Sequence, residues 1–334
     1  MGAVTAEQLY EATSGERLHA SGDYYRLSFR ALGTVNQLLF SARSRAVAEA
    51  FRESALRWVA GFEARYSRFL PDSLVSAIND AAGQRAVKVD AETEQIFALC
   101  DWFHWKTGGV FDPTEGPLIR LWDYNRQHTR LPTRDEVEQA RMLTGWRNVV
   151  RENGAVFLPR RGMSLDLGGI GKEYAVDRLC QMAIEAGLPD AMIDLGHDIR
   201  VYGQPPEKGP WRIGLERPDA PGSCWCGVAL RQIALCCSGS YQRYFELNGR
   251  RYSHLIDPRS GYPVDNGCRA VWAIAPTCTE AGVLSTAAFA LGAEEGLRLI
   301  ESTHNAGGCL WTDHGLYQAR RFQEHVLQDQ PIPA

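Results

Sequence analysis

The sequence predicts an α+β fold rather than a doubly wound parallel sheet. Segments with strand character cluster toward the C-terminal end, and strands and helices alternate irregularly along the chain. Such clustering is typical of α+β proteins, whereas a doubly wound sheet needs regular alternation. Hydrophobic residues make up 45% of the 334 residues and charged residues 23%, which is ordinary globular composition and provides ample material for a core.

Five segments have the spacing or the end signals of helices. Apolar residues of 47–66 recur at helical spacing. Thr133 and Glu136 have the pattern of a capping box, which predicts that a helix opens there. Gly187 and Gly292 follow two further candidates and would close them. The predicted helices are 47–66, 92–105, one opening at 133, 172–186 and 280–291.

Strand character begins at residues 26–40, which alternate around Gly33 and predict a hairpin or a bent strand pair. The other predicted strands are 163–167, 192–202, 211–216, 227–236, 243–256, 269–275 and 308–321. Polar and glycine- or proline-containing ends lie outside these elements. We therefore expect a flexible N-terminal tail over 1–22, a single domain over 23–323 and a C-terminal tail over 324–334.

Charge and hydropathy argue against several kinds of partner. The formal net charge of −4 disfavours a general nucleic-acid binder, since phosphate-rich partners demand a basic surface. Nowhere do about 18 consecutive apolar residues occur, so we expect no membrane insertion. The N-terminus has neither the basic start nor the apolar stretch of a secretory signal, and we expect a cytoplasmic protein.

The nine cysteines are an odd number and have no regular pairing pattern. Reduced thiols are therefore favoured over a disulfide framework. Cys224 and Cys226 bracket one residue, but no second pair lies at the spacing of a zinc site. Two structural cysteines on or near a strand are the preferred interpretation.

Residues 164–173 form the first of five stretches whose composition indicates chemistry. A predicted strand leads into the glycines of 168–171, and a helix opens with Lys172 in its first turn. Helix N–H groups favour an anion, and the lysine would add a point charge. The stretch lacks the glycine and hydroxyl spacing of a P-loop. A tight turn with an exposed lysine has the same composition, so the residues alone leave both interpretations open.

The second and third stretches are 237–243 and 254–263. Small hydroxyl residues around Gly239 suit a loop that holds phosphate or ribose, although an ordinary turn is the simpler alternative. His254 is a candidate general base, since histidine titrates near neutral pH. A packed histidine is the alternative there.

The fourth and fifth stretches are 108–118 and 279–292. The fourth is dense in turn residues and carries Asp112 and Glu115. It either lines a site or is a structural loop with solvated acids. For Glu115 the solvated acid is the preferred interpretation. The fifth places Ser285 and Thr286 inside a small, apolar helix, where hydroxyls bonded back to the backbone are the alternative.

Taken in order, these stretches resemble the FAD:protein FMN transferases, the ApbE family, from about residue 32 to 322. The similar pieces are 32–34, Glu63 with 67–73 and Asn79, 109–114, 166–172 with 174–177, Leu195-Gly196 with Asp198-Ile199, Ser238-Gly239 and 254–263. The resemblance implies a T-fold-like α+β core with FAD in an extended cleft. It also implies that a Thr or Ser hydroxyl of a target flavoprotein attacks the FMN phosphorus, with Mg²⁺ assistance, and that AMP leaves.

By the same resemblance, each candidate residue has an implied place. Residues implied near FAD or its phosphates are Gly33, Thr34, Asp72, Ser73, Gly168, Gly169, Ile170, Lys172, Ser238, Gly239 and His254. His254 would accept the proton, and Asp257 and Lys172 complete the implied catalytic group. Gly171 and Thr286 would lie at the magnesium ion. Phosphoryl transfer depends on alignment and charge neutralisation, which suits this set.

The sequence departs from the family pattern at positions that matter. Gly282 stands in place of a usual magnesium-ligand aspartate, and Glu173 stands in place of a usual glycine. Glu280 lies two residues before Gly282, which on a helix points to another face, so we do not expect it to replace the aspartate. Other departures are Leu32, His197, Cys237 and Ser253.

Two alternatives to the transferase remain open. One is an FAD pyrophosphatase that gives FMN and AMP with water as acceptor. The other is a non-catalytic protein that binds FAD. The missing carboxylate favours binding alone, whereas retention of Lys172, His254, Asp257 and Thr286 opposes it.

Overall fold

A nine-stranded antiparallel sheet is the centre of this computed structural model, which describes residues 4–241 and 243–327. Its strand order is β1-β2-β3-β7-β8-β11-β16-β17-β18. The strands are β1 (His19–Ser21), β2 (Tyr24–Ala31), β3 (Thr34–Ser41), β7 (Ala191–Leu195), β8 (Asp198–Tyr202), β11 (Ile233–Gly239), β16 (Cys268–Ala275), β17 (Gly307–Thr312) and β18 (Gly315–Gln318). The predicted α+β class is confirmed.

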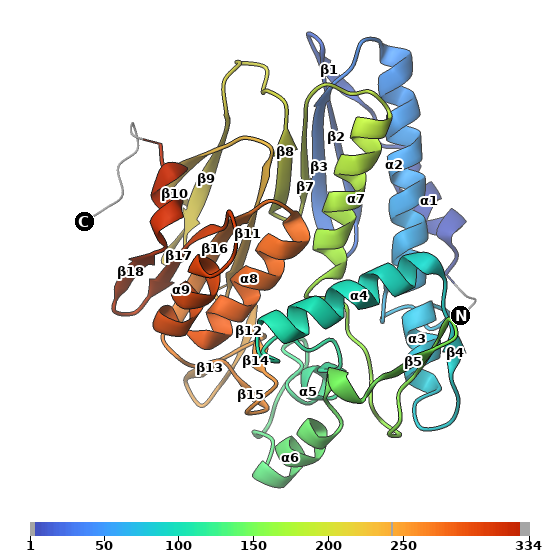
Figure 1. The fold of residues 1–334 in the computed structure, drawn as a ribbon, viewed down its shortest axis with the longest axis vertical. Helices are drawn as coiled ribbons and strands as arrows, with labels where there is room; N and C mark the ends of the chain where they lie inside the picture. Colours follow the sequence, from blue (N-terminus) through green and yellow to red (C-terminus); the bar gives the residue numbers. More distant parts are fainter. Residues whose placement is uncertain (1–3, 242, 328–334) are drawn as a thin grey trace.

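One face of this sheet is covered by helices, as Figure 1 shows. They are α2 (Arg45–Tyr66), α7 (Gly171–Glu185), α8 (Cys278–Leu291) and α9 (Ala293–Glu301). Helix α2 packs on β2, α7 on β7 and β8, and α8 on β11 and β16. Buried side chains of these helices and of the sheet form the largest hydrophobic cluster, with Phe40, Leu56 and Phe289 almost fully buried.

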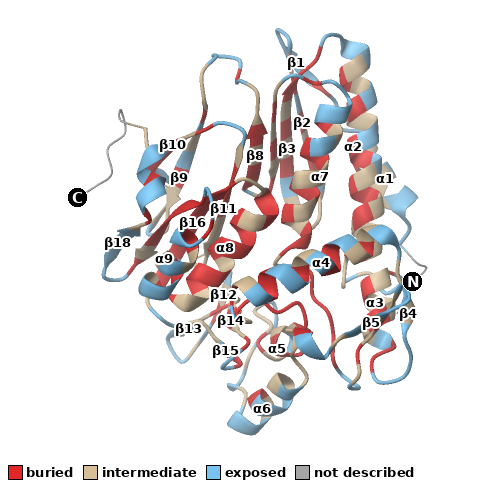
Figure 2. Cartoon of the chain, in the orientation of Figure 1, coloured by how far each residue is buried: buried red, intermediate tan, exposed pale blue. Residues whose placement is uncertain are grey.

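The opposite face of the second half of the sheet is covered by a hairpin of β9 (Trp211–Arg217) and β10 (Ala220–Leu230). Trp225 of β10 packs on Trp272 of β16, with ring centroids 5.3 Å apart. The 3₁₀ helix η2 (Arg320–Glu324) adds Phe322 to the same cluster. In Figure 2 the strands of the sheet and the helices that cover it carry bands of buried residues.

Further helices and short strands gather at one end of the sheet (Figure 1). The helices there are α3 (Leu74–Asp80), α4 (Ala91–Lys106), α5 (Gly116–Leu121), α6 (Arg134–Met142) and the 3₁₀ helix η1 (Trp146–Asn148). The strands there are β4 (Val87–Lys88), β5 (Val150–Glu152), β6 (Ala155–Phe157), β12 (Tyr244–Leu247), β13 (Arg250–Ser253), β14 (Ile256–Asp257) and β15 (Tyr262–Pro263). A separate small core of Leu118, Trp122, Val137, Phe245 and Ile256 joins α5 and α6 to these hairpins.

All five predicted helices are present, and the capping box of Thr133 and Glu136 forms as expected. Three long predicted strands are instead hairpins, because a turn divides each of 192–202, 243–256 and 308–321. The predicted strand at 163–167 is wrong. That segment is held by side chains, since Asn79 donates to the carbonyl of Leu165 at 3.0 Å and accepts from its N–H at 2.6 Å.

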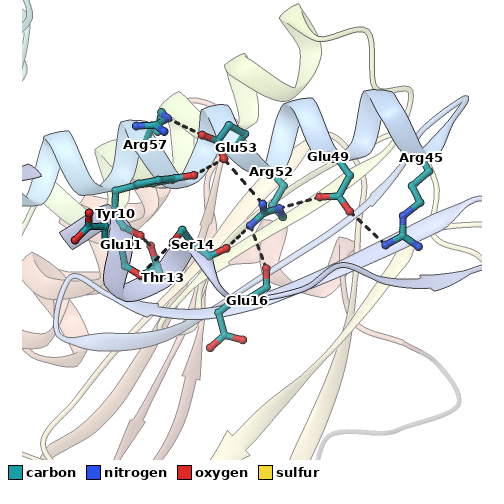
Figure 3. A network of polar contacts seen from close by, with 10 residues as sticks. All are labelled: Tyr10, Glu11, Thr13, Ser14, Glu16, Arg45, Glu49, Arg52, Glu53 and Arg57. Atoms are coloured by element: carbon teal, nitrogen blue, oxygen red, sulfur yellow. Dashed lines mark hydrogen bonds and ion pairs between the residues drawn. The ribbon is translucent and has the colours of Figure 1, made fainter. Parts of the chain in front are cut away.

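The N-terminal segment is not the tail that composition predicts. Helix α1 (Ala6–Ser14) opens with a capping box of Thr5 and Gln8 and packs along α2. Arg52 of α2 donates to the carbonyls of Ser14 and Glu16, at 2.9 and 3.1 Å (Figure 3). Polar contacts of this kind leave no apolar periodicity in the sequence, which explains the error.

The C-terminal residues are partly held as well. Val326 pairs with Val228, and Leu327 donates its N–H to the carbonyl of Gly227 at 2.9 Å. Residues 324–327 are therefore docked on β10 rather than forming a tail. The remainder of the predicted C-terminal tail, 328–334, lies outside the described residues.

Candidate functional site

The glycine-rich turn leads directly into α7, as the sequence predicts. Asp166 orders it, since one carboxylate oxygen accepts from the N–H of Gly168 at 2.7 Å and the other pairs with Arg68. Gly168 is exposed and Gly169 half-buried, whereas Ile170 is fully buried and anchors the turn. The first turn of α7 therefore begins beside an accessible loop, where free helix N–H groups favour an anion.

Lys172 lies in the first turn of α7 and has an acidic partner that sequence reasoning did not assign. Its ammonium pairs with Asp198, a residue only 4% exposed at the start of β8. The pair holds the lysine side chain near the glycine-rich turn. A buried acid at the start of the strand Asp198–Tyr202 was the signal available for this role.

Three hydroxyl groups meet where β11 ends against α8. The Oγ of Ser238 lies 2.8 Å from the Oγ of Ser285 and 3.0 Å from Oγ1 of Thr286. Ser285 also donates to the carbonyl of Gly282 at 2.9 Å, so its bonding back to the backbone is confirmed. Gly239 leaves room for a neighbouring ring, since a Cβ there would lie 2.6 Å from Tyr241 Cε1.

Helices α7 and α8 are fixed to each other by Asp177. Its carboxylate accepts from the N–H groups of Cys278 and Thr279, each at 2.9 Å, and from Arg200 at 2.7 Å. Glu173 lies four residues before Asp177 on α7, and Gly282 lies four residues after Cys278 on α8. These two residues face each other. The two helices therefore run antiparallel here, and one clamp sets both contacts.

The buried carboxylate that faces Gly282 has an unused acceptor. Glu173 is 7% exposed, and its Oε2 has no hydrogen-bond partner. No cluster of three or more His, Cys, Asp or Glu side chains with metal-site geometry exists in 4–241 and 243–327. Hydroxyl and carbonyl oxygens with one carboxylate suit Mg²⁺, which keeps several waters and needs few protein ligands. The donor set thus fits this ion better than a transition metal.

His254 follows β13 and is oriented by a backbone carbonyl. Its Nδ1 lies 3.0 Å from the carbonyl oxygen of Arg243, an arrangement in which Nδ1–H donates and Nε2 keeps a free lone pair. Tyr124 approaches its ring edge-on, with centroids 5.8 Å apart. Burial lowers the pKa of His254 to about 4, so the imidazole is neutral near pH 7. A neutral, oriented imidazole can accept a proton.

Asp257 holds the hairpin of β14 and β15. Its carboxylate pairs with Arg259 through two bonds, each at 2.9 Å, and its carbonyl accepts from the N–H of Gly261 at 2.8 Å. Gly261 has φ +80°, and a Cβ there would lie 2.8 Å from Val137 of α6. Asp257 thus shapes the loop that follows His254.

The residues at the β2–β3 turn form a second group. Gly33 and Thr34 line a cavity of about 280 Å³ with residues of α1 and with Glu63 of α2. Thr34 also packs against the β7–β8 turn, where a Cβ on Gly196 would lie 2.7 Å from its Oγ1. Wall residues from α1 show that the N-terminal segment belongs to this region.

Asp72 and Ser73 lie at the start of α3. Ser73 is 1% exposed, and its Oγ caps the helix by accepting from the N–H of Ser76 at 3.0 Å. Asp72 is exposed. The cap explains Ser73 structurally, and a contact of either residue with FAD stays a prediction.

Neither acid of the fourth stretch is fully solvated, contrary to the preferred interpretation for Glu115, which is half-buried. Asp112 is 6% exposed and accepts from the N–H groups of Thr114 and Trp146, at 2.8 and 3.0 Å. Burial, with the nearby carboxylates of Asp166 and Asp112, raises the pKa of Glu115 well above its usual value. In this loop, Glu115 forms a β-bridge with Ser164, which lies just before the glycine-rich turn.

A larger cavity of about 510 Å³ lies beyond the end of β11. Ser240, Tyr241 and Ser253 line it, together with residues of 264–269 and 311–313. It therefore lies between the end of β11 and the strand that leads to His254.

Cys224 and Cys226 lie on β10, as the structural interpretation predicts. All nine cysteines are free. In the described part of the chain, none of the helices has the length and hydropathy of a bilayer-spanning segment.

Known proteins resemble this chain over most of its length. The model of the ApbE family matches residues 22–311. An FAD:protein FMN transferase of Treponema pallidum is 30% identical over 286 residues, covering 80% of this chain and 79% of that protein. One from Klebsiella pneumoniae is 32% identical over 228 residues, covering 67% and 70%.

Solved structures of ApbE proteins also resemble this chain. The ApbE protein of Thermotoga maritima superposes with a TM-score of 0.82 at 32% identity, covering 91% of this chain and 100% of that one. The flavin transferase ApbE of Vibrio cholerae has the same fold, with a TM-score of 0.82 at 24% identity, covering 92% and 100%. The order of motifs, the sheet and the site at α7 and α8 agree with these comparisons. The chain belongs to the ApbE family.

Proposed function

We propose that this protein transfers FMN from FAD to a Thr or Ser hydroxyl of a target flavoprotein and releases AMP, with assistance from Mg²⁺. Family membership and relatives named FAD:protein FMN transferase support the reaction class. The observation that carries the proposal is the packing of α7, which has Lys172 in its first turn, against α8, which contributes Ser285 and Thr286 to the hydroxyl cluster with Ser238. These groups suit a pyrophosphate.

Each group would have a distinct task. Lys172 and the N–H groups at the start of α7 would bind and neutralise phosphate oxygens. Gly168, Gly169 and Ile170 would let the backbone approach the phosphates, and Ser238 and Gly239 would contact them from β11. Gly33, Thr34, Asp72 and Ser73 would lie along the rest of FAD. An extended cleft between these groups is part of the proposal.

His254 would accept the proton of the attacking hydroxyl. Its neutral imidazole and oriented Nδ1–H support this role, since a base must be unprotonated at the working pH. Asp257 would act by fixing the loop through Arg259. Mg²⁺, held near Thr286 and Gly171, would supply charge neutralisation for the FAD pyrophosphate as its bond breaks and AMP leaves. The partner would be a cytoplasmic flavoprotein, and nine free cysteines suit a reducing compartment.

Incubation of the purified protein with FAD and Mg²⁺, with and without EDTA, tests the proposal. An acceptor peptide bearing a Thr is included or omitted, and AMP and flavinylated peptide are measured by chromatography and mass spectrometry. We expect AMP and modified peptide only when Mg²⁺ and peptide are both present. His254→Ala should remove the activity, and His314→Ala, at an exposed histidine of the β17–β18 turn, should retain it.

Two results would contradict the proposal. AMP and FMN released equally without the peptide would identify an FAD pyrophosphatase. FAD bound but intact with Mg²⁺ and peptide would identify a flavin-binding protein without this activity.

A further inference from the structure

Glu173 occupies the space that a side chain on residue 282 would need. Gly282 lies on α8 and Glu173 in the first turn of α7. A Cβ built on Gly282 would lie less than 3.0 Å from Cγ of Glu173, 3.1 Å from its Cδ and 3.2 Å from its Oε1. The two positions therefore compete for one volume, and a side chain at 282 would displace Glu173.

The carboxylate of Glu173 is buried, and one of its two oxygens has no partner. The residue is 7% exposed, and its Oε2 has no hydrogen-bond partner. The Nζ of Lys172 forms a long ion pair with Oε1 at 3.9 Å, beyond hydrogen-bond distance, and a closer pair with Asp198. A buried carboxylate oxygen is costly unless a donor or a cation meets it. An ion bound at this oxygen would remove that cost.

The surroundings of this carboxylate offer oxygen ligands rather than nitrogen or sulfur. Its carboxyl group adjoins Gly282, whose carbonyl accepts from Ser285. Thr286 lies one helical turn after Gly282 and so projects from the same face of α8. Carboxylate, hydroxyl and carbonyl oxygens are the ligands that Mg²⁺ and Mn²⁺ prefer.

We infer that Glu173 is the carboxylate ligand of the divalent cation, supplied from α7 at the place where residue 282 of α8 carries none. The inference rests on the proposed function for the identity of the ion. Two departures from the family pattern, Glu173 for a glycine and Gly282 for an aspartate, then become one exchange across the contact between α7 and α8. Glu280 does not compete for this role, since it pairs with Lys106 of α4 at 3.4 Å.

Binding of Mn²⁺ to the FAD-loaded protein, followed by the electron paramagnetic resonance signal of free Mn²⁺, tests this assignment without any turnover. Glu173→Gln keeps the size of the side chain and removes its charge. It should weaken Mn²⁺ binding by at least about tenfold, since even the loss of an outer-shell partner costs about 10–100-fold. Glu280→Gln is the matched control on α8 and should leave the affinity unchanged.

The exchange itself is tested with residue 282. Gly282→Asp alone should not tighten Mn²⁺ binding, because the new side chain collides with Glu173 and places two carboxylates together. Glu173→Gly combined with Gly282→Asp should restore binding to the wild-type range. This double variant also decides the matter if Glu173→Gln fails to fold.

Three outcomes would overturn the inference: unchanged Mn²⁺ affinity in Glu173→Gln, tighter binding in Gly282→Asp alone, or no Mn²⁺ binding by the wild-type protein. Failure of the proposed function has a different signature. Mn²⁺ binding that depends on Glu173 without flavinylation of any acceptor would remove the transferase activity and leave the cation site in place.

Discussion

The charged side chains around the start of α7 are explained by their immediate partners. Lys172 pairs with the buried Asp198, and Glu173 fills the space beside Gly282. Asp198 is distant in sequence from Lys172, and Gly282 is distant from Glu173. A lysine held in this way is partly neutralised and positioned before any ligand arrives, which lowers the entropy that binding must overcome.

Replacing Lys172 should affect both binding and stability. Lys172→Ala should weaken FAD binding and lower the free energy of unfolding by about 3 kcal/mol, since it leaves Asp198 buried without its cation. Adding Asp198→Asn should recover much of the stability without recovering FAD affinity. Titration by flavin fluorescence and denaturant unfolding give the two values. Unchanged affinity in Lys172→Ala would remove this residue from the phosphate site.

The pKa of His254, lowered by burial to about 4, predicts a pH profile. The imidazole is unprotonated above that value. The acidic limb of a plot of kcat/KM against pH should therefore have its midpoint near pH 4 rather than 6.5. His254→Ala should abolish transfer and spare FAD binding. An acidic limb at 6.5 that disappears in this variant would contradict the lowered pKa.

The same group makes stability depend on pH. Between about 4 and 6.5 the unfolded chain binds more protons at this residue than the folded protein does. Its contribution is therefore fully present above about 6.5 and is lost as the pH falls toward 4. When the pH is lowered from 7 to 5, the denaturant concentration at the unfolding midpoint should fall more for the wild type than for His254→Ala.

At the scale of elements, one clamp sets the relation between α7 and α8. Asp177 caps α8 from α7, and the contact of Glu173 with Gly282 follows one turn away. The end of β11 then brings Ser238 to the two hydroxyls of α8. The site depends on how helices and a strand pack rather than on a single loop.

Loss of the clamp should loosen the site. Asp177→Ala should lower the free energy of unfolding by about 2 kcal/mol, the upper range for a helix cap. It should also weaken Mn²⁺ binding, because α8 is no longer fixed to α7. Asp90→Ala removes the cap of α4, where Asp90 accepts from the N–H of Thr93 at 3.0 Å, and is the matched control. Equal effects of both variants on Mn²⁺ binding would contradict a role for the clamp.

Across the whole molecule, the sheet joins segments that are distant in sequence. The N-terminal hairpin of β2 and β3 adjoins β7, and β8 adjoins β11. This order places Thr34 beside Gly196 and brings Asp198 and Ser238 into one region with α7. Helices on one face and the β9–β10 hairpin on the other then bury most of the thiols.

Thiol reactivity gives a test at this scale. Of the nine cysteines, Cys224 is exposed, Cys237 is half-buried and the rest are buried. Burial raises the pKa of Cys237 to about 12, which keeps it protonated. Ellman's reagent should therefore detect one fast thiol in the native protein and all nine after denaturation. Cys224→Ser should remove the fast reaction, and several fast thiols in that variant would contradict this burial.

Much of the fold could be predicted because its signals are local. Helical spacing, the capping box at Thr133 and the closing glycines Gly187 and Gly292 gave all five expected helices. The errors lie where side chains from elsewhere decide the backbone. Asn79 holds Leu165 outside any strand, and Arg52 holds the end of α1.

The sequence by itself determined the family, the α+β class and the order of the motifs around Lys172, Ser238 and His254, because these depend on local patterns and on residue identity. Tertiary structure alone decided which of these side chains are neighbours. It assigned Asp198 to Lys172, lowered the pKa of His254 by burial and placed Glu173 against Gly282. Distance and burial arise from packing between segments far apart in the chain, and no local pattern encodes them.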